Sequence, residues 1–146
     1  MYRELIAECS RGNNWAKLQP PCPMAEIESA EAYIGYAFPA ALKELLLETN
    51  GDRWLLHSVQ EIIENVRLNR SILTECFDDP EEFRDRIDRY IFFAGNGCGD
   101  HYCYRVLPDG KTDGSAIYIW EHETFESRIV ARDIPELIRK YYNSEI

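Results

Sequence analysis

The fold class follows from residues 91–104, which read Ile-Phe-Phe-Ala-Gly-Asn-Gly-Cys-Gly-Asp-His-Tyr-Cys-Tyr. The first four residues form an unbroken apolar run, as in a buried strand. The glycines at positions 95, 97 and 99 then provide the backbone freedom that a tight turn needs. Residues after the turn alternate, so His101 and Cys103 share one face of a second strand, opposite Tyr102. The stretch therefore predicts two antiparallel strands joined by a glycine-rich turn.

The predicted sheet extends beyond this stretch, and helices precede and follow it. Residues 116–120 form a third apolar strand after the Asp109-Gly110 turn, and such hairpin-length connections make the sheet mainly antiparallel. Residues 54–56 predict a further short strand. Apolar residues at helical spacing predict helices at 2–8, 25–34 and 39–49, and helices that begin near 59, 80 and 134.

Capping motifs mark where the last three of these helices begin. Ser58, Asp79 and Asp133 are each followed three positions later by a glutamate. The second motif starts an acidic helix whose Phe83 and Ile87 are expected to face inward. Helices, a strand meander and a closing helix in this order predict a single α+β domain over residues 1–146, with helices packed around a mainly antiparallel sheet.

The charge balance argues against direct binding to nucleic acid. The 146 residues carry 26 acidic and 16 basic side chains, which gives a formal net charge of −10 at pH 7. Binding to phosphates needs a basic surface whose lysines and arginines displace counterions. We therefore expect no direct nucleic-acid partner.

We expect a cytoplasmic protein without a membrane segment. The longest uncharged apolar stretch, residues 32–42, is about half the length of a spanning helix and is broken by Gly35 and Pro39. Charged residues at positions 3, 4 and 8 interrupt the place where an export signal would be apolar. Five cysteines at irregular spacing indicate free thiols rather than a disulfide framework.

Reactive side chains gather at Cys98, His101, Cys103 and His122. A zinc site needs about four ligands in a tetrahedron, but no CxxC pair is present and strand alternation does not bring these four together. A cysteine nucleophile needs an adjacent base, which the sequence places beside neither sulfur. We therefore expect no metal, no cofactor and no catalytic residue. An enzyme built on these four residues is the less favoured alternative.

Acidic and aromatic residues follow the predicted strand ends. Asp100 follows the glycine turn, where it is expected to accept local hydrogen bonds, and Glu121 and Glu123 follow the third strand. Trp54 and Trp120 each fit either a core position or an aromatic anchor on a binding surface. Because the turn and the strand end could share one edge of the sheet, we expect a partner-binding surface at Asp100, Trp120, Glu121 and Glu123. The alternative is that Asp100 and Trp120 hold the fold.

Five short motifs occur in order within residues 24–142. They are an amphipathic helix with Phe38-Pro39 and Asn50-Gly51, then Ser58-Val59-Gln60-Glu61-Ile62, then residues 93–102, then Ile117-Tyr118-Ile119-Trp120-Glu121-His122-Glu123, and then the last helix. Together they resemble the signature of the SMI1/KNR4 (SUKH) superfamily. Two positions depart from it, since Phe38 replaces the usual leucine and Asn96 replaces a frequent acidic residue.

The resemblance implies an α+β domain without catalytic activity or cofactor. Bacterial members of the superfamily are typically immunity proteins that bind and neutralise a cognate polymorphic toxin, often a nuclease, whereas fungal members act as regulatory scaffolds. We therefore predict a non-catalytic immunity protein whose partner is a protein toxin, with a nuclease as the expected type. A scaffold or peptide-binding module is the alternative. The acidic composition agrees with the first prediction, because opposite charge speeds association with a basic nuclease.

Overall fold

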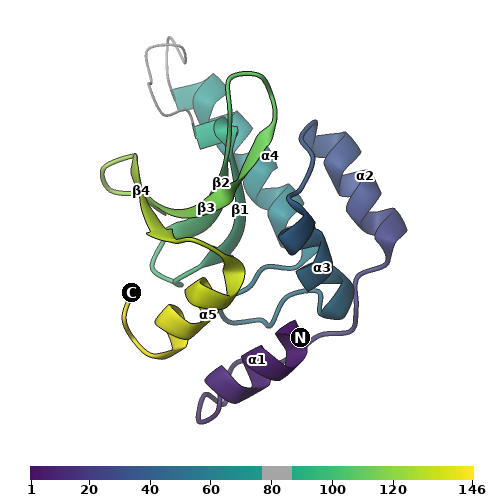
Figure 1. The fold of residues 1–146 in the computed structure, drawn as a ribbon. Coiled ribbons are helices and arrows are strands. Elements are labelled where there is room, and N and C mark those ends of the chain that lie inside the picture. Colours follow the sequence, from purple (N-terminus) through teal and green to yellow (C-terminus); the bar gives the residue numbers. More distant parts are fainter. Residues whose placement is uncertain (77–86) are drawn as a thin grey trace.

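The computed structural model describes residues 1–76 and 87–146, and these residues confirm the predicted α+β class (Figure 1). The helices are α1 (Tyr2–Cys9), α2 (Met24–Ile34), α3 (Ala40–Glu48), α4 (Val59–Cys76), the short 3-10 helix η2 (Ile87–Arg89) and α5 (Ile134–Tyr142). The strands are β1 (Tyr90–Gly95), β2 (His101–Val106), β3 (Thr112–Glu121) and β4 (Glu126–Ala131).

The predicted helix starts are confirmed where the structure describes them. At the start of α4, the Ser58 N–H donates to Glu61 Oε1 at 3.0 Å and the Glu61 N–H donates to Ser58 Oγ at 3.2 Å, which is a complete capping box. At the start of α5, Asp133 Oδ1 accepts from the Glu136 N–H at 2.9 Å. The motif predicted at Asp79 lies outside the described residues, as does Phe83, whereas Ile87 is buried in η2.

The sheet is an antiparallel meander in the order β1-β2-β3-β4. Its fourth strand was not predicted, because the charged residues of 126–131 hide a short alternating pattern. The predicted strand at 54–56 is wrong: only Leu56 pairs with the sheet, through an isolated bridge to Ala94. The reason is local, since the carboxylate of Asp52 binds the backbone N–H groups of residues 54–56 and holds them in a turn.

Both faces of the sheet are covered, which explains why every residue of β1 is buried. One face packs against the helices and contributes Ile91, Phe93, Tyr102 and Tyr104 to the main core. The opposite face forms a smaller cluster with the end of α4 and with η2, made of Leu73, Ile87, Tyr90, Phe92, Cys103 and Trp120. As the alternation predicted, Cys103 and Tyr102 lie on opposite faces.

Helices from the two ends of the chain lie together. α1 packs against α5, and Figure 1 shows both at the same end of the molecule, away from the β2–β3 hairpin. α2 packs on α4, which in turn contacts β1. None of the helices in the described parts of the chain is long and apolar enough to cross a membrane.

Candidate functional site

Asp100 joins the glycine turn to the end of β3. Its Oδ1 accepts from the His122 backbone N–H at 3.0 Å and lies 2.7 Å from His122 Nδ1, while Oδ2 accepts from Asn96 Nδ2 at 3.3 Å. Partial burial opposes ionisation of this carboxyl, but the hydrogen bonds from His122 and Asn96 outweigh it and lower the pKa of Asp100. The expected role as a local acceptor is confirmed, and the turn and the strand end do share one edge.

Gly99 is required for this arrangement. Its φ of +99° lies in the left-handed region, and a Cβ at this position would stand 2.9 Å from His122 Nδ1. Only glycine avoids both the strained backbone and the collision. The glycine turn therefore shapes the edge so that the His122 ring can lie against it.

Two further histidines lie beside this edge. The rings of His57, just before α4, and His101, at the start of β2, have centroids 5.7 Å apart, and His101 stacks on Phe92 at 4.7 Å. Burial lowers the pKa of His101 to about 4, with repulsion from His57 adding to the shift when His57 is protonated, and burial also lowers the pKa of His57. Both rings are therefore neutral at pH 7.

These histidines line a hollow of about 270 Å³. We call it the histidine hollow; its lining includes Trp54, His57, Glu61, Asp100 and His101. His57 Nε2 and His101 Nδ1 are buried, and no hydrogen-bond partner for either atom lies within residues 1–76 and 87–146. The hollow thus combines an indole, two carboxylates, the Arg53 guanidinium and two neutral imidazoles.

Asp52 fixes the loop that carries Trp54 beside the hollow. Its side chain is fully buried, and Oδ1 accepts from the backbone N–H groups of residues 54, 55 and 56 at 3.0, 2.9 and 2.8 Å. Oδ2 accepts from the Tyr142 hydroxyl of α5 at 2.6 Å. Arg53, between the fixed residues, has a positive φ of 62°. One buried carboxylate therefore holds the loop in a single shape.

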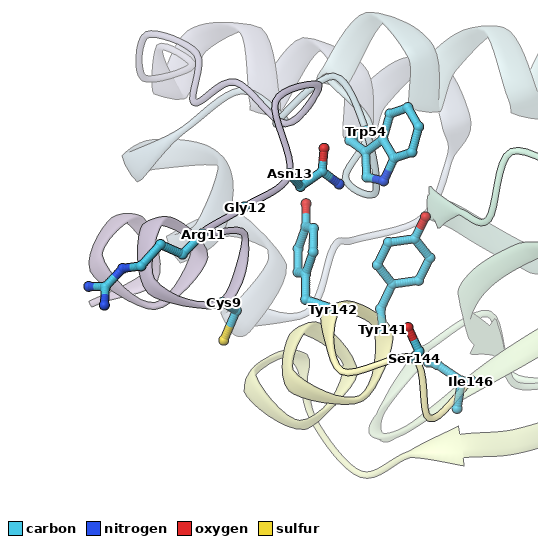
Figure 2. A pocket seen from close by; sticks show the side chains of 9 residues that line it. All are labelled: Cys9, Arg11, Gly12, Asn13, Trp54, Tyr141, Tyr142, Ser144 and Ile146. Atoms are coloured by element: carbon cyan, nitrogen blue, oxygen red, sulfur yellow. The ribbon is translucent and has the colours of Figure 1, made fainter.

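Trp54 and Trp15 form an exposed aromatic pair. Trp15 is 70% exposed and Trp54 is 45% exposed, and their rings stack with centroids 6.3 Å apart. The adjoining hollow has a volume of about 500 Å³. Figure 2 shows that Tyr141 and Tyr142 of α5 face Trp54 and Asn13 there. Large exposed aromatic side chains on a fixed loop are typical of an interaction surface.

The four residues expected to bind a partner differ in their placement. Asp100 is half-buried, Glu121 pairs with Arg128 at 3.2 Å, and Glu123 is exposed in the β3–β4 turn. The expectation for Trp120 as a surface anchor is wrong. This side chain is only 2% exposed, because it packs between Tyr90, Phe92 and Phe125 in the smaller cluster.

The residues of the alternative enzyme site do not converge. Cys98 is exposed in the glycine turn, whereas Cys103 is buried, and its thiol donates to the Tyr118 carbonyl at 3.6 Å. Burial raises the pKa of Cys103 well above its ordinary value, which disfavours the thiolate. Among the residues that the structure describes, no group of three or more His, Cys, Asp or Glu side chains is placed to hold a metal ion.

Most residues of this region were not identified from the sequence. Trp54 was expected in a strand, as either a core residue or a surface anchor, and Trp15, Arg53, Asp52 and His57 were not singled out. Asp52 carries the usable signal, because an aspartate after Asn-Gly favours a turn that its own carboxylate closes.

Comparison with known proteins points to one family. No curated protein matches the chain. Residues 21–140 match the model of the SMI1/KNR4 family (SUKH-1), a span that includes Asp52, Trp54, the glycine turn and Asp100. Because this match covers well over half of the 146 residues, the chain belongs to the SMI1/KNR4 family (SUKH-1).

Proposed function

We propose that this protein is a non-catalytic immunity protein that binds a protein toxin and blocks it by forming a stoichiometric complex. The observation that carries the proposal is the match of residues 21–140 to the SUKH-1 family, which includes toxin immunity proteins. A cognate nuclease is the favoured toxin. The protein acts in the cytoplasm of the cell that makes it.

The charge of the molecule supports this choice of partner. The formal net charge of −10 attracts a basic protein, and nucleases are basic where they grip a phosphate backbone. Such attraction raises the association rate more than the final affinity. Asp100, Glu121 and Glu123 are the carboxylates that we propose for first contact along the turn edge.

Co-expression with a toxin whose gene lies next to the gene of this protein tests the proposal. We expect cells to survive only when both proteins are made, and we expect the purified toxin to lose its activity at one equivalent of this protein. Failure of protection together with failure of the purified proteins to associate would refute the proposal. A regulatory scaffold would instead bind other proteins and leave the toxin active.

The electrostatic part has a separate test. Measured by stopped flow, the association rate constant should fall as salt rises, because ions screen the attraction between the two surfaces. An association rate that does not change with salt would remove the steering argument while leaving the binding itself in place.

A further inference from the structure

Trp15, Arg53 and Trp54 form a surface that we call the tryptophan ridge. Its loops are held by short-range hydrogen bonds: Asn13 Oδ1 accepts from the backbone N–H groups of residues 15 and 16 at 2.8 and 3.2 Å, and Asp52 holds the loop at 54–56. The two indoles are exposed before any partner binds. A surface that is already ordered loses little conformational entropy on binding.

Hollows surround the tryptophan ridge. Trp54 lines the 500 Å³ hollow, Arg53 lines another of about 440 Å³, and both residues line the histidine hollow. Tryptophan and arginine are the residue types that most often carry binding energy at protein interfaces, especially next to pockets that a partner fills. The ridge and its hollows therefore have the shape and the composition of a protein-docking surface.

The charges of the histidine hollow select the partner's side chain. Glu61 and Asp100 contribute two carboxylates, and Arg53 contributes one cation. His57 and His101 are neutral, so they do not repel a cation. The exposed Trp54 ring adds an aromatic surface on which a cation can rest. A lysine or arginine side chain fits this combination better than an acidic or apolar side chain.

We propose that the tryptophan ridge and the histidine hollow are the surface that contacts the toxin, with a lysine or arginine of the toxin seated in the hollow between Trp54 and Asp100. This proposal rests on the proposed function and names the part of the molecule that performs it. It places the centre of contact at Trp54, which lines the same hollow as Asp100 of the turn edge.

Matched variants test the proposal by calorimetry with the toxin that the wild-type protein neutralises. Trp54→Ala removes an exposed ring, and Glu61→Gln removes one charge while a glutamine still completes the capping box. We expect the Kd to rise about thirty-fold or more for Trp54→Ala and about tenfold for Glu61→Gln. Leu68→Ala, at an exposed position of α4 that lines none of these hollows, is the control and should change the Kd less than about twofold.

Fluorine NMR reports the contact independently of any mutation. The chain has three tryptophans, so biosynthetic 5-fluorotryptophan gives three resonances, each assigned by a Trp→Phe variant. On addition of unlabelled toxin, the resonances of Trp15 and Trp54 should shift, whereas that of the buried Trp120 should stay in place.

The outcomes separate this proposal from the proposed function. If the wild-type protein neutralises the toxin while Trp54→Ala binds as tightly as Leu68→Ala and the Trp15 and Trp54 resonances do not move, the docking surface lies elsewhere and only this proposal is overturned. If the tryptophan resonances shift but Glu61→Gln binds like the wild type, the basic side chain in the hollow is overturned. If the wild-type protein binds no toxin, both proposals are overturned.

Discussion

Replacing Asp52 with alanine is expected to lower the free energy of unfolding by about 4 kcal/mol. The carboxylate accepts hydrogen bonds from the backbone N–H groups of residues 54, 55 and 56 and from the Tyr142 hydroxyl. A hydrogen bond to a charged group contributes about 1.5–3 kcal/mol, so four such bonds contribute at least about 6 kcal/mol. Removing a buried charge recovers part of this, which leaves about 4 kcal/mol.

Urea denaturation followed by circular dichroism measures this loss. Because domains are stable by about 5–15 kcal/mol, the Asp52→Ala protein should still fold, with a melting temperature lower by about 8–16 °C. Tyr142→Phe removes one of the four bonds and should cost about 1–2 kcal/mol. Asp52→Asn retains an acceptor oxygen, so its loss of unfolding free energy should lie between those of Asp52→Ala and Tyr142→Phe.

A small effect would refute the assignment. If Asp52→Ala costs less than about 1 kcal/mol, the carboxylate does not hold the loop that carries Trp54. If Asp52→Asn is as unstable as Asp52→Ala, the acceptor geometry is not what stabilises the loop. Either result would also remove the argument that the tryptophan ridge is ordered before binding.

Three other predictions concern single positions. Gly51→Ala should lower the free energy of unfolding, measured in urea, by about 3 kcal/mol or more, because a Cβ at this φ of +85° would stand 2.8 Å from a backbone oxygen. Gly110 has the same φ but open space around it, so Gly110→Ala should cost only about 1 kcal/mol. Equal losses for the two variants would contradict the steric argument. The free energy of unfolding should fall by about 3 kcal/mol as the pH falls from about 6.5 to about 4, because His101 gains a proton in the unfolded chain but not in the folded chain. His101→Gln should remove this part of the pH dependence of the free energy of unfolding. Pulsed iodoacetamide labelling read by mass spectrometry should modify exposed Cys98 quickly and buried Cys103 only on unfolding; rapid labelling of Cys103 would contradict its placement in the core.

Local signals in the sequence predicted much of the fold. The capping box at Ser58, the left-handed residue Gly35 at the end of α2 and the glycine turn before β2 each act over a few residues, so their effect can be read without the tertiary structure. β4 was missed because Glu126 and Arg128 make the strand too polar for an apolar pattern to stand out. Its place in the sheet depends on pairing with β3, which is a tertiary effect.

The candidate site was only partly predictable for a related reason. The joining of Asp100 to the end of β3 follows from a hairpin, which is a local structure. The exposure of a tryptophan depends on what the rest of the chain covers, and composition treats Trp54 and Trp120 alike. Trp120 is covered by Tyr90 and Phe92 of β1 and by Phe125 of the following turn, whereas Trp54 is held outward by a carboxylate whose fourth partner lies 90 residues later in the chain.

That long-range bond has a consequence for synthesis. Asp52 leaves the ribosome long before Tyr142, so the loop lacks its partner on α5 until the last helix has been made and has docked. A nascent or truncated chain that ends before Tyr142 carries the same two tryptophans without this closing bond. The surface that we assign to the toxin therefore gains the last of the hydrogen bonds to Asp52 only when α5 is in place.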